Sequence, residues 1–485
     1  MGDTDLSMTD LVVVRPNNQK EMYGPLSASM SAVEPPLWAA LLAAHARGLG
    51  YTVSIIDAQL HGWNAEWTAK EVALRNPILT LIVVSGNNPT ASTPVMSCVP
   101  ELVTQIRRFG TKIIALAGLH PSALPEQTLR ETGADFVVQG EGFYTLGYLL
   151  TALKYDKVLD LKGLWRNNGI PQPSPNIGSL DALPMPAWDL LPMHLYQAHN
   201  WHCFGDVPRQ PYGVVYTSFG CPFECSFCNI NTLFGKRGIR YRSPELVVDE
   251  IRHLVEVYGV KNLKIMDEMF LLNKEHVEAI CEGIKDYDLN IWCYARVDTL
   301  DAAILDLLVG AGFRWLGIGV ESGSDEIRQK VHKGKFSKQY IRQAFDYVRK
   351  GGLYIAANYI FGLPDETPES MQETLRFAKE LNTEYANFYV AMPYPGSKLY
   401  EQAVKVPDSW AGYAQLSEDT QPMDTRYLSG DAILKFRDKA FIEYFSRPEY
   451  QSMMAQTFGP TVIDKIDEML KFKVIRGRMV ESITV

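Results

Sequence analysis

Three closely spaced cysteines constrain this chain more than any other feature of its sequence. Cys221, Cys225 and Cys228 form a C-x3-C-x2-C run. Thiolates at this spacing lie on one compact loop and can ligate three irons of a cubane cluster, which leaves the fourth iron open for chemistry. Zinc is the main competitor, but it usually takes a fourth protein ligand at short spacing, and no Cys or His closes this set nearby. The run follows the apolar stretch 214–218, which is typical of a site at the end of a strand.

The cysteine run, with the aromatic Phe227 just before its last cysteine, resembles the signature of the radical SAM superfamily. The resemblance implies a 4Fe–4S cluster whose open iron binds the amino and carboxylate groups of S-adenosylmethionine (SAM). An electron from the reduced cluster then cleaves SAM to methionine and a 5′-deoxyadenosyl radical. We expect a reductase- or flavodoxin-type partner to donate that electron.

Composition excludes several other classes of protein. The 485 residues allow about two to four domains, and 46% hydrophobic with 21% charged residues is ordinary for a globular chain. A net charge of −9 argues against a nucleic-acid partner or an anionic membrane surface. No apolar run approaches the roughly 18 residues of a membrane-spanning helix, and the N-terminus lacks signal-peptide features. The other four cysteines are scattered, so we expect no disulfide framework and predict a cytoplasmic protein.

Residues 1–150 are predicted to form a doubly wound, Rossmann-like α/β domain. Short apolar runs alternate there with helical patterns, which indicates a parallel sheet covered on both faces. No Gly-x-Gly-x-x-Gly follows the first run, so a dinucleotide is not expected. A corrinoid site, a response-regulator-like role and a bare interaction module remain as alternatives. The apolar runs span 11–14, 53–56, 79–84, 112–116 and 136–138.

Three further segments follow this domain. Prolines break residues 151–205 into a linker that we expect to pack between the domains. Residues 206–400 regain a strand–helix rhythm and predict a partial (βα)6 barrel of the TIM type, with functional groups at the C-terminal ends of its strands. Residues 401–485 are mostly helical in pattern, and either cap the barrel or form a dimer contact. The expected barrel strands are 213–219, 262–267, 291–296, 315–320, 353–360 and 386–391.

The ends of the second and third barrel strands carry candidate SAM-binding residues. Asp267 and Glu268 loosely match the acidic position that, in the radical SAM family, accepts a hydrogen bond from the SAM amino group. A solvated acidic loop is the alternative. Arg296 could hold a carboxylate, and a structural salt bridge explains it equally well.

The later strand ends extend the resemblance. Glu321 and Ser322 match the family pattern near the ribose and methionyl groups of SAM. Asn358 and Gly362 lie in the segment that touches adenine in relatives, where glycine lets a flat ring approach the backbone. Aromatic residues could line the barrel mouth and contact the substrate, and they are Tyr294, Tyr359, Tyr389 and Tyr394.

The loops of the N-terminal domain favour cobalamin by resemblance. They look like the loops that line the corrin in the cobalamin-binding branch of radical SAM proteins, and residues 34–38 are similar to the segment that opens that branch's first helix. The residues assigned to cobalamin on this basis are Ser85, Gly118, His120, Gly140 and Glu141.

The loop after the first predicted strand departs from many cobalamin proteins. Those proteins carry Asp-x-His-x-x-Gly, which supplies a histidine to cobalt, whereas residues 15–19 here read Arg-Pro-Asn-Asn-Gln. His61 follows the second strand at the wrong spacing. We therefore predict base-off cobalamin with no histidine below cobalt.

Together the two modules resemble the cobalamin-dependent radical SAM enzymes, and class B radical SAM methyltransferases in particular. The resemblance implies methyl transfer from SAM, through methylcobalamin, to an unactivated carbon or a phosphinate phosphorus of a small, natural-product-like substrate. A non-methylating oxidation, cyclisation or rearrangement is the alternative. The complete cysteine run disfavours a non-catalytic corrinoid carrier. A methylthiotransferase would need three further clustered cysteines in the N-terminal domain, which has only one cysteine.

Overall fold

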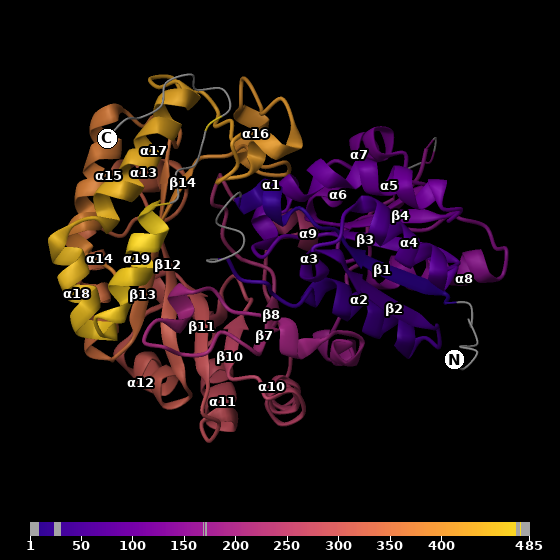
Figure 1. The fold of residues 1–485 in the computed structure, drawn as a ribbon, viewed down its shortest axis with the longest axis horizontal. Coiled ribbons are helices and arrows are strands. Elements are labelled where there is room, and N and C mark those ends of the chain that lie inside the picture. Colours follow the sequence, from indigo (N-terminus) through magenta and orange to yellow (C-terminus); the bar gives the residue numbers. More distant parts are fainter. Residues whose placement is uncertain (1–8, 24–30, 168, 170–171, 472–475, 477–485) are drawn as a thin grey trace.

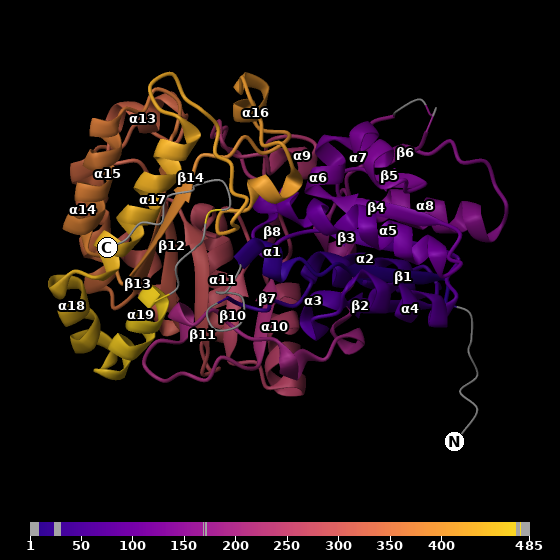
Figure 2. The ribbon, with the colours of Figure 1, turned by 45° about the horizontal axis from the view of Figure 1, so that its top comes forward.

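The computed structural model describes residues 9–23, 31–167, 169, 172–471 and 476. Two α/β units lie side by side, an N-terminal sheet with its helices and a larger open barrel (Figure 1, Figure 2). The last helices of the chain pack on the barrel, on the side away from the N-terminal sheet. No helix among these residues is both long and apolar enough to cross a membrane.

The N-terminal sheet is doubly wound, which confirms the prediction. Its strand order is β2-β1-β3-β4-β5-β6, and all neighbours are parallel except the last pair. The order therefore reverses between β1 and β3, and ligands of such sheets bind beyond the carboxyl ends of the strands at this reversal. The strands are β1 (Leu11–Arg15), β2 (Val53–Asp57), β3 (Leu79–Val84), β4 (Ile114–Gly118), β5 (Phe136–Val138) and β6 (Leu164–Trp165).

Alternate side chains of β1 enter two separate cores, because successive strand residues point to opposite faces of a sheet. The odd-numbered residues pack with α2 (Leu37–Gly48) and α8 (Phe143–Lys154). The even-numbered residues pack with α4 (Ala65–Arg75) and α5 (Val99–Arg108). Coverage of both faces explains why these strands are continuous apolar runs in the sequence. The other helices of this unit are α1 (Gln19–Tyr23), α3 (Ala58–His61), α6 (Leu119–Ala123) and α7 (Pro125–Thr132).

Six parallel strands form the barrel sheet in the order β14-β13-β12-β11-β10-β7. Because β14 and β7 stand at the two ends of this order, the barrel is incomplete, as predicted. The strands are β7 (Tyr212–Val215), β10 (Asn262–Ile265), β11 (Asn290–Ala295), β12 (Phe313–Glu321), β13 (Tyr354–Phe361) and β14 (Tyr385–Val390). The helices between them are α9 (Asn231–Phe234), α10 (Pro244–Tyr258), α11 (Lys274–Ile284), α12 (Ala302–Gly310), α13 (Asp325–Lys330), α14 (Lys338–Lys350) and α15 (Pro368–Leu381).

The expected strand 213–219 is divided in two, which corrects the prediction. β7 stays in the barrel, whereas β8 (Ser218–Phe219) pairs antiparallel with β9 (Arg240–Tyr241). Between β7 and β8, Thr217 donates its backbone N–H and its hydroxyl to the Asp267 carboxylate at 2.7 and 2.6 Å. These bonds draw the chain out of the barrel sheet, and the cysteine loop begins directly after β8.

Part of the predicted linker 151–205 belongs to the N-terminal sheet, because β6 pairs with β5, whereas its later part and the C-terminal region pack against the barrel. Trp201 of the linker stacks on Tyr385 of β14 with ring centroids 5.6 Å apart. Phe458, at the end of α18, stacks on Trp315 of β12 at 5.7 Å. The C-terminal helices are α16 (Lys398–Gln402), α17 (Gly430–Phe445), α18 (Pro448–Phe458) and α19 (Thr461–Lys471).

The segment before α17 also returns to the N-terminal unit. The Trp410 indole N–H donates to Glu131 Oε2 of α7 at 2.7 Å. The described C-terminal residues thus pack within this chain, on the barrel wall and on the N-terminal unit, and they hold the two units together.

Candidate active site

Tertiary contacts hold the cysteine loop on several sides. Gly220 adopts φ +97°, and a Cβ there would lie 2.4 Å from the Gly238 carbonyl oxygen, so only glycine fits. Ser226 donates its N–H to Val331 O at 3.0 Å and accepts from Leu399 N at 2.9 Å. The loop is thereby joined to the ends of α13 and α16, and its shape does not depend on its own sequence alone.

The three cysteines of the loop are free thiols that are partly buried. Burial raises the pKa of Cys221 to about 11 and also raises that of Cys228, and charge on the neighbouring cysteines raises both further. The thiols are therefore close enough to repel one another as thiolates, and bound iron would reverse this cost because metal ligation stabilises thiolates. Among the described residues, no three His, Cys, Asp or Glu side chains already converge as metal ligands do. Phe227 packs on a small core that includes Leu363.

Arg296 lies beside the loop but is engaged by the protein itself. Its guanidinium contacts Asp298 twice at 2.9 Å, covers the Phe223 ring at 3.7 Å and donates to Lys333 O at 2.6 Å. One of its nitrogens is 4.0 Å from Cys225 Sγ. The structural salt bridge is therefore present, and it places a positive charge next to the cysteine loop.

The adjacent carboxylates after β10 have different surroundings. Asp267 is buried and accepts from Thr217 and from the Ser218 hydroxyl, so it holds the strand end and is not the solvated loop residue of the alternative interpretation. Both carboxylate oxygens of Glu268 are buried without a partner at hydrogen-bond geometry, and burial raises its pKa to about 8 although the nearby backbone N–H groups of Glu268 and Gly220 lower it. A buried carboxylate needs a donor. Glu268 is thus the residue of this pair that fits the SAM ammonium group.

Glu321 and Ser322 end β12 in a strained turn. Glu321 adopts φ +65°, which is uncommon for a residue with a side chain, and its carboxylate binds Lys333 Nζ at 2.7 Å. Ser322 is fully buried, and its hydroxyl donates to Glu366 at 3.4 Å and lies 3.2 Å from the Thr374 hydroxyl. Both side chains therefore have protein partners, and their contact with SAM stays a prediction.

Asn358 and Gly362 lie on β13 and just beyond it. Asn358 Oδ1 accepts from Asn387 Nδ2 at 2.9 Å. Gly362 adopts φ +80°, and a Cβ there would lie 2.7 Å from Ile433 Cδ1 of α17. The contact with α17 is enough to require glycine at position 362. The glycine is therefore no evidence for an adenine ring, and the adenine contact also stays a prediction.

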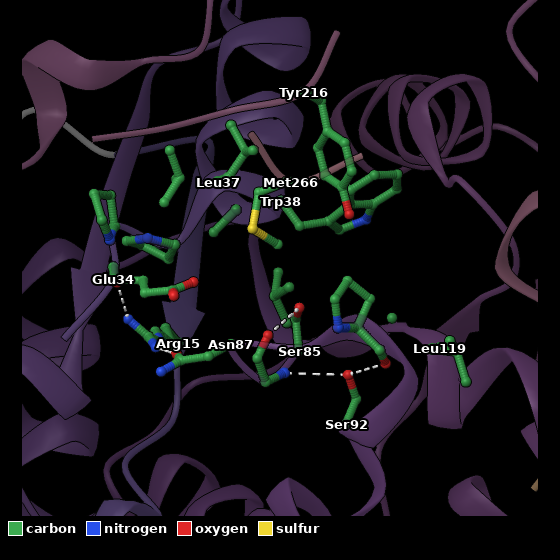
Figure 3. Close-up of a pocket in the computed structure, with 18 of the residues that line it drawn as sticks. Arg15, Glu34, Leu37, Trp38, Ser85, Asn87, Ser92, Leu119, Tyr216 and Met266 are labelled. Atoms are coloured by element: carbon green, nitrogen blue, oxygen red, sulfur yellow. Dashed lines mark hydrogen bonds between the residues drawn. The ribbon is translucent and has the colours of Figure 1, made fainter. Parts of the chain in front are cut away.

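A pocket lies where the N-terminal sheet meets the barrel. Figure 3 shows Trp38, Tyr216 and Met266 on one side of it and Ser85 and Ser92 on the other. It opens at the ends of β1, β3 and β4, which is the reversal of strand order, and its volume is about 630 Å³ including open solvent. The indole N–H of Trp38 is buried there without a hydrogen-bond partner, so a ligand with an acceptor fits this site.

Two of the residues assigned to cobalamin, Ser85 and Gly118, line this pocket. Gly118 has φ +124°, and a Cβ there would lie 2.2 Å from Val84 O, because β3 and β4 are packed closely at their ends. A side chain at this position would force the two strands apart at the edge of the pocket.

The other three assigned residues are not among those that line the pocket. His120 packs edge-on against Trp410 at 4.5 Å, and burial lowers its pKa to about 3. Glu141 forms an ion pair with Arg240 that joins the two units, and a Cβ on Gly140 would lie 2.8 Å from the Ser174 hydroxyl. These residues serve packing in the structure, and any contact with cobalamin stays a prediction.

The tyrosines expected at the barrel mouth divide between two faces of the sheet. Tyr359 is fully buried on the outer face, stacked on Phe388, so the prediction that it lines the mouth is wrong. Tyr294 and Tyr389 lie on the interior face. Tyr394 follows β14, packs against the main core and donates its hydroxyl to Tyr413 O at 3.4 Å.

Sequence reasoning missed a buried ionic network beside the pocket. Lys264 of β10 is 1% exposed, and its Nζ lies 3.1 Å from both Glu34 carboxylate oxygens and 2.8 Å from Asn87 O. Arg15 donates to Glu34 O at 2.6 Å and to Asn87 Oδ1 at 3.1 Å, and it lies 3.4 Å from Asp57. Burial raises the pKa of Glu34 and lowers that of Lys264, while their pairing opposes both shifts. The feature of the sequence that could have indicated this network is Lys264, a lysine within an apolar strand.

Comparisons with known proteins agree with this arrangement. Residues 215–378 match the Radical SAM superfamily and residues 25–150 match the B12 binding domain. An uncharacterized methyltransferase of Pyrococcus horikoshii is 33% identical over 86% of this chain and 88% of its own. An anaerobic magnesium-protoporphyrin IX monomethyl ester cyclase of Rubrivivax gelatinosus is 26% identical over 87% of this chain and 77% of its own. The solved radical SAM methyltransferase TsrM of Kitasatospora setae, with cobalamin and a 4Fe–4S cluster bound, has a TM-score of 0.68 at 19% identity, covering 91% of this chain and 90% of that one.

A cysteine loop at the end of one barrel and a pocket at the switch point of a doubly wound sheet define a radical SAM enzyme with a cobalamin domain. This chain belongs to the cobalamin-dependent radical SAM methyltransferases, which confirms the family inferred from its cysteine run and N-terminal loops.

Proposed function

We propose that the enzyme transfers a methyl group from SAM, by way of cobalamin, to an unactivated carbon or a phosphinate phosphorus of a small, natural-product-like molecule. One observation carries this proposal: two segments of the chain serve both candidate cofactor sites. Tyr216 and Met266 both line the pocket. Cys221 lies five residues after Tyr216, and Glu268 lies two residues after Met266. The two sites are therefore adjacent, as a reaction that uses both cofactors on one substrate requires.

The residues of the chain have separable tasks in this proposal. When bound, the cluster with SAM supplies a hydrogen-abstracting radical and cobalamin supplies the methyl group. The three cysteines hold the cluster, and the carboxylate of Glu268 binds the ammonium group of SAM. Trp38, Tyr216 and Met266 form an apolar wall of the pocket that excludes water from the reaction.

The experiment that tests this function is anaerobic turnover with CD3-labelled SAM, excess cobalamin and a reductant. We expect both S-adenosylhomocysteine and 5′-deoxyadenosine, with the label on cobalamin or on the substrate. The relationship with the magnesium-protoporphyrin ester cyclase favours a second candidate, a non-methylating oxidation or cyclisation. Formation of 5′-deoxyadenosine without S-adenosylhomocysteine would support that candidate and reject methyl transfer.

We further propose that cobalamin is bound base-off with no protein nitrogen on cobalt. Among the described residues that line the pocket there is no histidine, and the exposed His61 stacks on Trp63 at 4.6 Å. EPR of the protein loaded with cob(II)alamin should therefore lack nitrogen superhyperfine splitting. A nitrogen-split spectrum would contradict this proposal.

An external electron donor completes the proposed cycle. The sequence holds one cluster of cysteines, so no second iron–sulfur centre is available within the chain to relay electrons. We expect a reductase or flavodoxin-type protein to reduce the cluster, and the substrate to be a small molecule with no nucleic acid or membrane involved.

A further inference from the structure

The interior face of the barrel sheet is open to solvent near the strand ends, whereas its outer face is buried. The register pairs Asn358 with Asn387 and Ile360 with Tyr389, so these four side chains share one face. On β13 and β14 the residues of this face are partly exposed or exposed, except for the buried Ala356, and the residues between them are buried. Because the outer face is covered by helices, solvent reaches these side chains from inside the barrel.

Tyr389 marks an enclosed space within this interior. The residue is 37% exposed, and yet burial raises the pKa of its hydroxyl well above the usual value, with Tyr294 as the first of the neighbours that add to the shift. A side chain that contacts solvent while protein surrounds it lies in a concavity. Gly317 keeps room beside Tyr294, since a Cβ there would lie 3.2 Å from the tyrosine ring.

Tyr294 stands between the two candidate cofactor sites. Two residues further along the chain, Arg296 lies 4.0 Å from Cys225 Sγ of the cluster loop. On the other side, Lys264 Nζ is 5.6 Å from the Tyr294 ring centroid and is bonded to Glu34 of the pocket. A substrate must reach both the radical source and the methyl carrier. It therefore has to lie in the barrel beside Tyr294, between the two candidate cofactor sites.

The described side chains named here present rings and amides to this chamber, and Glu268, assigned above to the SAM ammonium group, is a carboxylate near Tyr294 without a hydrogen-bond partner. Lys264 is paired with Glu34, and Arg296 with Asp298. Asn387 Nδ2 donates to Asn358 Oδ1. The Nδ2 group of Asn358 and the Oδ1 atom of Asn387 make no hydrogen bond within this pair, so a donor and an acceptor are left for a ligand.

We propose that the substrate is an uncharged, planar aromatic molecule, held between Tyr294 and Tyr389 with its polar edge on the Asn358–Asn387 amides. This proposal rests on the function proposed above and names its substrate class. Aromatic walls also suit cations, but Glu34 is already paired with Lys264 and Glu268 is assigned to the SAM ammonium group, so a cationic substrate would find no carboxylate partner among these residues. An anion would find Lys264 and Arg296 already paired with carboxylates.

The test uses the full-length holoprotein, reconstituted with cluster and cobalamin, and three probes that share a naphthalene ring: 2-naphthol, 2-naphthoate and trimethyl(2-naphthyl)ammonium. Equilibrium dialysis measures the Kd of each probe. We expect 2-naphthol to bind at least about fivefold more tightly than either charged probe, because burying a charge without a partner costs free energy. Tyr389→Ala should weaken 2-naphthol binding by about fivefold or more, and Tyr389→Phe should stay within about twofold. Tyr148→Ala, on the exposed side of α8, is the matched control.

Tighter binding of either charged probe would overturn the substrate class, and so would failure of all three probes to bind. Unchanged 2-naphthol binding in a Tyr389→Ala protein that keeps its cobalamin absorbance would overturn the site. If that variant loses cobalamin, Asn387→Ala gives the same test. Binding as expected, combined with no S-adenosylhomocysteine in turnover, would reject methylation and leave the chamber assignment intact.

Discussion

Cys225 shows how the candidate cluster site depends on single side chains. Its thiol lies 4.0 Å from an Arg296 nitrogen and 3.8 Å from the His332 carbonyl oxygen, outside the pocket assigned to cobalamin. We expect Cys225→Ala to lose 5′-deoxyadenosine formation and cluster iron while cobalamin stays bound, because a cluster with two thiolates is poorly held. Iron analysis, product chromatography and the cobalamin absorbance measure these three quantities. Cys98→Ala, on the other side of the N-terminal sheet, should change none of them, and 5′-deoxyadenosine from the Cys225→Ala protein would refute the cluster assignment.

Glu366 provides a second prediction at this scale, in the pH dependence of stability. It accepts from Gly362 N and Leu363 N at 2.7 and 3.1 Å, and burial nevertheless raises its pKa from 4.5 to about 7. The folded protein therefore holds this proton more tightly than the unfolded chain does. Its contribution to the free energy of unfolding is full below pH 4.5 and is lost as the pH rises through about 7.

Glu366→Gln removes this titration while keeping the shape of the side chain. Relative to the wild type, the variant should gain stability between about pH 5 and about pH 8, measured by urea unfolding at each pH. A difference between the two proteins that does not vary with pH would show that Glu366 does not titrate in this range.

At the scale of elements, β13 and α17 meet at Gly362. Gly352 offers a matched comparison, because its φ of +86° is similar and a Cβ there would meet nothing within 4 Å. Gly352→Ala should cost about 1 kcal/mol for the left-handed backbone. Gly362→Ala carries the same cost plus the clash with Ile433, and we expect it to lose about 2 kcal/mol more in urea unfolding. Equal losses in the two variants would mean that α17 is not held at this point.

At the scale of the whole molecule, the Lys264–Glu34 pair joins the barrel to the N-terminal unit. Lys264→Met leaves the Glu34 carboxylate buried without its ammonium partner, and we expect a loss of about 3 to 5 kcal/mol together with weaker cobalamin binding. Adding Glu34→Gln should restore part of that loss, because the unpaired charge is removed. Unfolding in urea and cobalamin titration measure the two effects.

The control for this pair is Lys261→Met. Lys261 precedes β10 and lies 3.9 Å from Asp288, and both side chains are largely exposed. The substitution should therefore change the free energy of unfolding by no more than about 0.5 kcal/mol. Equal effects of Lys261→Met and Lys264→Met would remove the basis for calling the buried pair a link between the units.

Local patterns in the sequence predicted the doubly wound sheet, the open barrel and the enzyme family. Apolar runs and loop spacings are properties of neighbouring residues, so they can be recognised without knowing what packs against them. The break between β7 and β8 could not be predicted in this way. It depends on Asp267, which lies 50 residues after Thr217.

The sequence by itself determined which groups are available for chemistry: three thiols on one loop, a pair of carboxylates, and an N-terminal sheet whose first loop lacks histidine. Only the tertiary structure decided which of them are free. Asp267 is occupied by the strand end and Glu268 is left without a partner, and Lys264 meets Glu34 across 230 residues. The physical reason is that most buried polar groups pair with whatever partner the fold brings to them, and those partners come from distant parts of the chain.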